Sequence, residues 1–158
     1  MNEKKHIFKR KTIILFCGFA AILIGLIMYK YISEYDYRQL SKSFYNHYIS
    51  LADNIYEKTT IDICIDDLRN ILMSNESQET LETLENTLLQ IKEKVPISKY
   101  YYYSKMENKL NDIKILYNYI TKDVEEVSHD DWDDFSFAYR NIRRDARTWR
   151  DDPSVRRW

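Results

Sequence analysis

Residues 12–29 read TIILFCGFAAILIGLIMY, a run of 18 residues without a charge, Asn, Gln or Pro. At about 1.5 Å per residue, an α-helix of this length rises roughly 27 Å, close to the roughly 30 Å hydrocarbon core of a bilayer. Tyr31 and Ile32 extend the apolar length, and Lys30 can direct its amine toward the headgroups. The sequence therefore predicts a single N-terminal transmembrane helix over residues 12–32, with the lipid bilayer as a partner.

Three alternatives compete with a permanent span. A cleaved signal peptide usually has a shorter apolar core and small residues at its cut site, whereas MYKYISEY (28–35) offers no small-residue pair. A lipoprotein would use Cys17, but the bulky Phe16 precedes it. The third alternative is a buried helix of a soluble protein, which the all-round apolarity and the basic flank disfavour.

The charges on either side of this run differ. Residues 1–11 hold five Lys and Arg against Glu3, a formal charge of +4, while residues 30–40 are formally neutral. Because short cytoplasmic segments carry the excess of Lys and Arg, residues 1–11 are expected to form a cytoplasmic basic tail. The predicted location is thus a single-pass protein of the cell membrane with residues 33–152 outside the cytoplasm.

Small residues within the run suggest a packing face. Gly18, Ala21 and Gly25 follow one another at steps of three and four, as in faces through which membrane helices approach closely. We therefore take these three residues as candidates for transmembrane packing, with a homodimer as one outcome. The alternative is that small residues are simply common in membrane helices.

Composition excludes several classes of function. Residues 30–158 hold 19 Lys and Arg against 24 Asp and Glu, a net charge that argues against nucleic acid as a partner. With no glycine beyond Gly25, the chain has no phosphate-binding glycine loop, dinucleotide turn or nucleophile elbow. Cys17 lies in the predicted membrane span and Cys64 lies beyond it, so the two are not expected to form a disulfide. Cys64 is expected to be a small buried residue. We expect no enzyme activity and no cofactor.

After the membrane boundary, apolar residues recur at steps of three and four, which predicts amphipathic helices. No Pro or Gly separates the first of these helices from the span, so the two are expected to run as one. The stretch 61–73 is also expected to be helical, although IDICI (61–65) alternates as a strand would. The other predicted apolar faces are Tyr37, Leu40, Phe44, Tyr48, Leu51 and Ile55; Leu81, Leu84, Leu88, Ile91 and Val95; Tyr103, Met106, Leu110, Ile113, Tyr117 and Ile120; and Trp132, Phe135, Tyr139, Ile142, Ala146 and Trp149.

The helix ends carry their own signals. Thr59 and Thr60 interrupt the first helix. Pro96 ends the predicted helix that contains Leu81–Val95, and Ser98 is expected to cap the helix that follows. Ser128 with Asp131 three residues later predicts a capping box. The fold class is therefore all-α: a transmembrane helix followed by an antiparallel bundle of four to five helices over 33–152, then a tail over 153–158. A dimeric coiled coil is the alternative architecture.

The C-terminal part of the chain is rich in Arg and Trp. From residue 123 onward there are seven Arg and no Lys. Acidic residues begin the last helix and basic ones end it, which the helix dipole alone explains in part. Because Arg and Trp are frequent in interface hot spots, the sharper hypothesis is a docking site for a protein partner or an adjacent domain. Its candidate residues are Arg147, Trp149, Arg150, Arg156, Arg157 and Trp158.

Two further clusters have simple interpretations. In the run Tyr100–Tyr103 only Tyr103 lies on an apolar face, and we expect the other three tyrosines to be half-buried rather than an exposed patch. His129 and its neighbouring aspartates lack the glycine turn and the ligand spacing of metal sites, so no metal is expected.

These features favour a non-enzymatic interaction module on a membrane anchor, such as an accessory, assembly or immunity-type subunit of a cell-envelope complex. Its partner would be another membrane or surface protein. The alternative is a ligand-binding or sensory bundle that signals through a partner.

Overall fold

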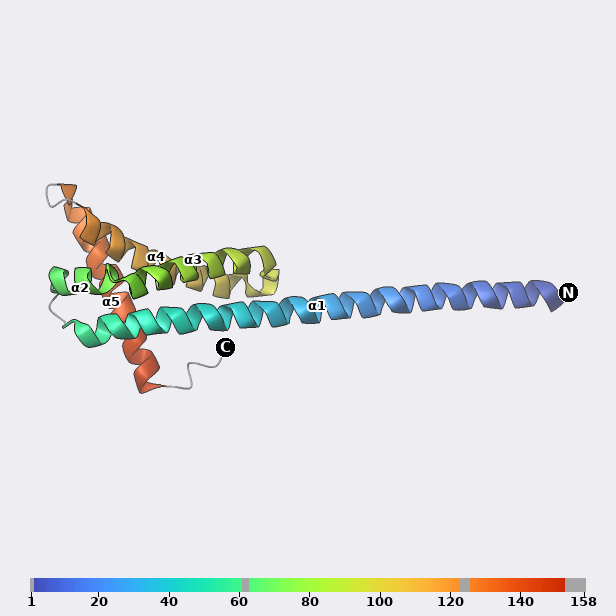
Figure 1. Ribbon diagram of the computed structural model, residues 1–158. Helices are drawn as coiled ribbons and strands as arrows, with labels where there is room; N and C mark the ends of the chain where they lie inside the picture. Colours follow the sequence, from blue (N-terminus) through green and yellow to red (C-terminus); the bar gives the residue numbers. More distant parts are fainter. Residues whose placement is uncertain (1, 61–62, 123–125, 153–158) are drawn as a thin grey trace. The chain divides into compact units, whose positions relative to one another are not determined.

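The computed structural model describes residues 2–60, 63–122 and 126–152, with side chains from residue 16 onward. These residues form five α-helices that pack together and one short 3₁₀ helix (Figure 1). The predicted all-α class is confirmed. The elements are α1 (Asn2–Lys58), α2 (Ile65–Leu72), α3 (Asn75–Lys94), η1 (Ile97–Lys99), α4 (Tyr100–Thr121) and α5 (His129–Asp151). The chain divides into two compact units, Met1–Asp36 and Tyr37–Trp158.

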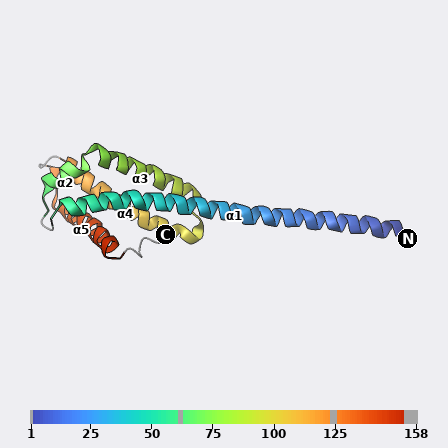
Figure 2. The ribbon, with the colours of Figure 1, turned by 60° about the horizontal axis from the view of Figure 1, so that its bottom comes forward.

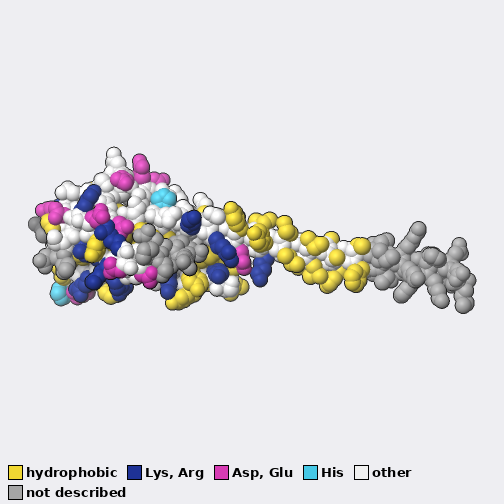
Figure 3. All heavy atoms as spheres, turned by 90° about the horizontal axis from the view of Figure 1, so that it is seen from below, with side chains coloured by type: hydrophobic (Ala, Val, Ile, Leu, Met, Phe, Trp, Pro, Cys, Tyr) yellow, Lys and Arg dark blue, Asp and Glu magenta, His cyan; other side chains and the backbone are white. Residues whose placement is uncertain are grey.

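The first unit consists of the N-terminal part of α1. From Phe16 onward this helix holds an 18-residue window of mean hydropathy 1.7, none of it buried, so by length and composition it is suited to a membrane anchor or a signal sequence. Hydrophobic side chains cover the visible face of this segment in Figure 3. A Cβ added at Gly18 or Gly25 would meet no atom within 4 Å, so no other part of the described chain packs on these glycines.

The second unit has one hydrophobic core to which every α-helix contributes. Helix α4 is central, because it packs against α2, α3 and α5. Most residues of the predicted apolar faces are buried, but Trp132 is exposed and four others are half-buried, namely Leu40, Leu81, Val95 and Tyr117. Leu116, which lies outside the predicted face of α4, is fully buried. The reason is that a helix covered on several sides needs a wider apolar face than a single stripe provides.

The connections between helices follow the sequence signals with two exceptions. Helix α1 ends at Lys58, directly before Thr59, and the predicted capping box of Ser128 and Asp131 is present at the start of α5. The prediction that Ser98 caps α4 is wrong. Ser98 lies within η1, whose Lys99 N–H donates to the Pro96 carbonyl at 2.8 Å, so the 3₁₀ turn leads directly into α4.

The second exception concerns Cys64, which is exposed rather than buried. It stands at the N-cap position of α2, outside the apolar face of that helix. The competing strand over 61–65 does not form at Ile65, where α2 begins, whereas residues 61–62 lie outside the described residues.

Helices α3 and α4 form an antiparallel pair joined through η1, and they lie side by side in both Figure 1 and Figure 2. Helix α5 crosses the other helices of the second unit obliquely (Figure 1). This crossing leaves room between the N-terminal half of α4, the C-terminal half of α5 and the residues of α1 that belong to the same unit.

Candidate functional site

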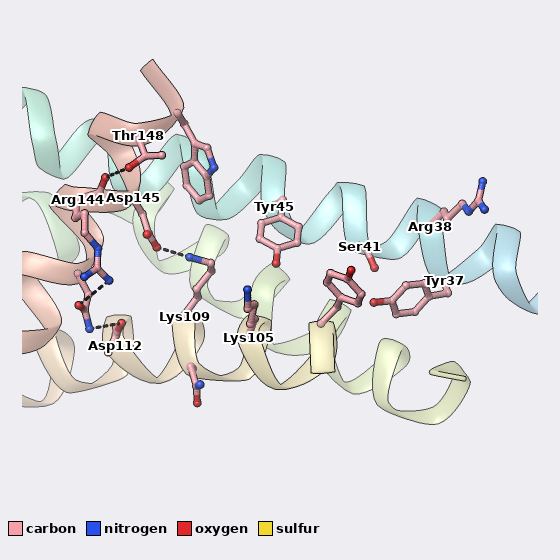
Figure 4. Close-up of a pocket in the computed structure, with 14 residues that line it drawn as sticks. Tyr37, Arg38, Ser41, Tyr45, Lys105, Lys109, Asp112, Arg144, Asp145 and Thr148 are labelled. Carbon is pink, nitrogen blue, oxygen red and sulfur yellow. Dashed lines mark hydrogen bonds and ion pairs between the residues drawn. The ribbon is translucent and has the colours of Figure 1, made fainter. Parts of the chain in front are cut away.

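A groove of about 680 Å³ occupies this space (Figure 4). Its walls come from three helices of the second unit, namely α1 from Tyr37 onward, α4 and α5. The lining residues are Tyr37, Arg38, Ser41, Tyr45, Tyr102, Lys105, Asn108, Lys109, Asp112, Asn141, Arg144, Asp145, Thr148 and Trp149.

An ion pair above two aromatic rings, Tyr48 and Trp149, which we call the groove floor, joins the three helices between the two ends of the groove (Figure 4). The Lys109 ammonium pairs with Asp145, and the Tyr48 hydroxyl donates to the same carboxylate at 2.9 Å. Lys109 Nζ also lies 5.0 Å from the ring centroid of Tyr48 and 5.2 Å from that of Trp149, within reach of a cation–π attraction. Burial, together with the Asp145 charge, raises the pKa of Tyr48 well above its usual value of 10.0. Tyr48 therefore acts as a neutral hydrogen-bond donor.

A second polar cluster lies on the facing sides of α4 and α5. Asn141 Nδ2 donates to Asp112 at 3.2 Å, and Arg144 donates to the Asn141 side-chain oxygen at 3.1 Å (Figure 4). Burial raises the pKa of Asp112 above its usual 3.8, while the Asn141 hydrogen bond acts in the opposite direction. The amide of Asn141 thus links a carboxylate to a guanidinium without direct pairing.

The α1 wall of the groove is aromatic. Burial raises the pKa of Tyr45 to about 12 and also raises that of Tyr37. Between these rings, the buried Ser41 Oγ has no hydrogen-bond partner of ordinary geometry among the described residues, although its proximity to Tyr37 partly offsets the effect of burial on the Tyr37 pKa. This wall therefore offers apolar contact together with hydroxyl groups.

The charges of the lining are unequal. Among the described residues, four cationic side chains line the groove with two carboxylates; the cationic ones are Arg38, Lys105, Lys109 and Arg144. Asp145 already accepts from Lys109 and Tyr48, and Asp112 accepts from Asn141. Lys105 has no carboxylate partner in the described part of the chain, and its Nζ lies 4.6 Å from the ring centroid of Tyr101. The lining is thus suited to a ligand that carries negative charge next to apolar surface.

The candidate docking residues of the last helix are placed differently from one another. Trp149 is buried, with its ring edge-on to Tyr48 at 5.4 Å and to Tyr45 at 6.4 Å. Arg150 binds Asp53 at 3.2 Å and also Glu57, and lies over the Tyr56 ring. Trp149 and Arg150 therefore stabilise the packing of α5 on α1. Because Trp149 is buried, only the edge of its ring that lines the groove is accessible to a partner.

The other candidates are more dispersed. Arg147 is exposed and lies 3.5 Å from Asp151, whereas Arg156, Arg157 and Trp158 lie outside the described residues. Gly18, Ala21 and Gly25 are exposed on the first unit. In the described residues, no three His, Cys, Asp or Glu side chains converge as metal ligands would.

The tyrosine run does not have its expected burial. Tyr100, Tyr101 and Tyr102 are 58%, 65% and 51% exposed, so the prediction that they are half-buried is wrong and the alternative of an exposed patch holds. Among the four tyrosines only Tyr103 is buried, so the other three occupy the remaining sides of the first turn of α4.

Little in the sequence indicates the groove itself. Lys109 and Asp145 each stand next to an apolar-face residue, Leu110 and Ala146, which is where charged residues commonly flank a core. Their pairing depends on how three helices meet and has no local signal.

Comparison of the chain with protein-family models, with curated proteins and with solved structures found no match.

Proposed function

We propose that this protein is a membrane-anchored binding module whose groove receives an acidic segment of another membrane or surface protein. Residues 12–32 form the anchor, residues 1–11 lie in the cytoplasm and residues 33–152 lie outside it. The observation that carries the proposal is the groove, in which an excess of cationic side chains faces aromatic walls.

The anchor is supported by the exposure of the apolar part of α1. Phe16, Phe19, Ile24 and Ile27 are all more than half exposed, and no described residue of the chain covers them. In water, each such side chain would forgo roughly 1.5–3 kcal/mol of transfer free energy. Lipid removes this cost without requiring a protein partner, and the α-helical backbone satisfies its own hydrogen bonds there.

Recognition of an acidic side chain in the groove depends on two exposed cationic groups. Lys105 and the α5 guanidinium of Arg144 are exposed and stand on opposite walls, while Tyr45 and Trp149 supply apolar surface between them. An acidic side chain flanked by apolar residues satisfies both features. Such contacts give specificity and a faster encounter, because complementary charge steers association.

A second candidate function is a small-ligand sensor. The groove volume of about 680 Å³ lies within the roughly 300–1,000 Å³ range of small-molecule sites. An anionic small molecule would use the same cationic and aromatic side chains, so the two candidates differ only in the size of the occupant.

Photo-crosslinking in native membranes tests the proposal. A photoreactive phenylalanine replaces Asn108, which is exposed and lines the groove, and a matched control carries it at Gln90, exposed on α3. We expect a protein adduct at position 108 alone, lost in the double variant Lys105→Glu/Arg144→Glu and kept in Lys92→Glu.

Equal yields of adduct at positions 108 and 90 would contradict the proposal. So would an adduct at position 108 that persists in Lys105→Glu/Arg144→Glu. A small molecule retained by the purified protein in native mass spectrometry, and released by Lys105→Glu/Arg144→Glu, would favour the sensor instead.

A further inference from the structure

An exposed apolar cluster lies where η1 leads into α4. Ile97 is 96% exposed and stands beside the three exposed tyrosines Tyr100, Tyr101 and Tyr102; we call these four residues the tyrosine patch. Exposed apolar side chains that cluster in this way usually mark a contact surface. Nothing else in the described chain covers the patch.

Two lysines flank the tyrosine patch. Lys99 Nζ lies 5.6 Å from the ring centroid of Tyr102, and Lys105 Nζ lies 4.6 Å from that of Tyr101. Neither lysine has a carboxylate partner in the part of the chain that the structure describes. The surface thus combines amphipathic rings, one aliphatic side chain and two cationic groups.

The location of the patch within its unit is fixed by Tyr102. Tyr102 and Tyr37 line the same groove, and the charge that Tyr102 would carry contributes to the raised pKa of Tyr37. Tyr37 begins the second unit, and only four residues separate it from Ile32, the last residue of the proposed span. Five helical steps rise roughly 7.5 Å.

This distance matches the thickness of a headgroup layer. A bilayer of about 40–45 Å with a core of about 30 Å has roughly 5–8 Å of headgroups on each side. The covalent link from Ile32 to Tyr37 therefore keeps Tyr37 itself within reach of the headgroups.

Resting on the proposed membrane anchor, we propose that the tyrosine patch binds the headgroup layer of the same bilayer. Tyrosine favours this layer because its ring is apolar and its hydroxyl is hydrated. Ile97 reaches toward the acyl chains, and Lys99 and Lys105 attract lipid phosphates. A protein partner would not require the patch to lie near Tyr37, which is only five helical steps from the predicted membrane boundary. Since Tyr102 belongs to both features, the groove then opens beside the membrane surface.

Site-directed fluorescence tests the depth of the patch in the full chain. In a Cys17→Ser/Cys64→Ser background, an environment-sensitive fluorophore is attached to Ile97→Cys, to Met73→Cys or to Ile24→Cys. Met73 is an exposed control at the C-cap of α2, two residues before α3 begins and therefore roughly 30 Å from the C-terminus of α3, and Ile24 reports on the anchor. The protein is reconstituted in vesicles of phosphatidylcholine and phosphatidylglycerol, with quenching by spin-labelled lipid and by aqueous iodide.

We expect lipid quenching at position 97 from a shallow spin label, with loss of iodide quenching, whereas position 73 stays open to iodide. Tyr100→Ser/Tyr101→Ser/Tyr102→Ser should restore iodide quenching at position 97 while circular dichroism stays unchanged, because these side chains are exposed. If position 24 is quenched by lipid and position 97 resembles position 73, the patch inference fails and the anchor stands. If position 24 is not quenched by lipid, the anchor fails and the patch inference with it.

Discussion

Removing the Tyr48 hydroxyl tests whether the groove floor is a coupled unit. The side chain is fully buried, and its hydroxyl donates to Asp145 at 2.9 Å. A hydrogen bond to a charged group contributes about 1.5–3 kcal/mol. In Tyr48→Phe the Asp145 carboxylate keeps Lys109, so it is not left without a partner, and we expect the free energy of unfolding to fall by the lower figure, about 1.5 kcal/mol.

Removing the carboxylate has a larger effect. Breaking a buried ion pair costs about 3–5 kcal/mol, but the Lys109 and Asp145 side chains here each retain 19% exposure, which lowers the cost. We expect Asp145→Ala to lower the free energy of unfolding by about 3 kcal/mol. The reason is that it leaves the Lys109 ammonium without a carboxylate partner and the Tyr48 hydroxyl without an acceptor. The double variant Tyr48→Phe/Asp145→Ala should cost no more than Asp145→Ala alone.

The assay is urea unfolding of the reconstituted protein, followed by tryptophan fluorescence and circular dichroism, with the slope of the transition compared among variants. Tyr117→Phe is the matched control, because that ring is half-buried and its hydroxyl has no partner in the described residues; its change should stay within about 0.5 kcal/mol. Additive effects of Tyr48→Phe and Asp145→Ala would refute the coupling, since independent sites add and interacting ones do not.

Three further predictions concern the second unit. Ser128→Ala removes the cap of α5 and should lower the urea midpoint by an amount equal to about 1 kcal/mol; an unchanged midpoint would contradict the capping box. Burial raises the pKa of Asp112, so its contribution to stability is full below about pH 3.8 and is lost as pH rises through the folded-state pKa. Asp112→Asn should therefore gain stability relative to the parent between acid and neutral pH in thermal unfolding, and a difference independent of pH would oppose this. Leu84→Ala should cost about 2–5 kcal/mol in urea unfolding, against less than about 0.5 kcal/mol for Leu89→Ala, because Leu84 is fully buried and Leu89 is 61% exposed; similar costs for both would place the core elsewhere.

Local signals in the sequence determined the helices. The end of α1 before Thr59, the end of α3 before Pro96 and the Ser128–Asp131 capping box each depend on residues within one or two helical turns, so a single stretch of chain is enough to specify them. The all-α class followed from the same periodicity. The prediction for Ser98 is wrong because this residue lies within η1, the 3₁₀ turn that leads into α4.

Only the tertiary structure decided which side chains meet. Lys109 and Asp145 are 36 residues apart, and Tyr48 is 97 residues from Asp145, so no periodic pattern within one helix relates them. The exposure of Tyr100–Tyr102 likewise depends on which sides of the first turn of α4 the rest of the unit covers. Periodicity specifies that a helix has an apolar face, whereas the oblique crossing of α5 determines how much of each face is covered and where a groove is left open.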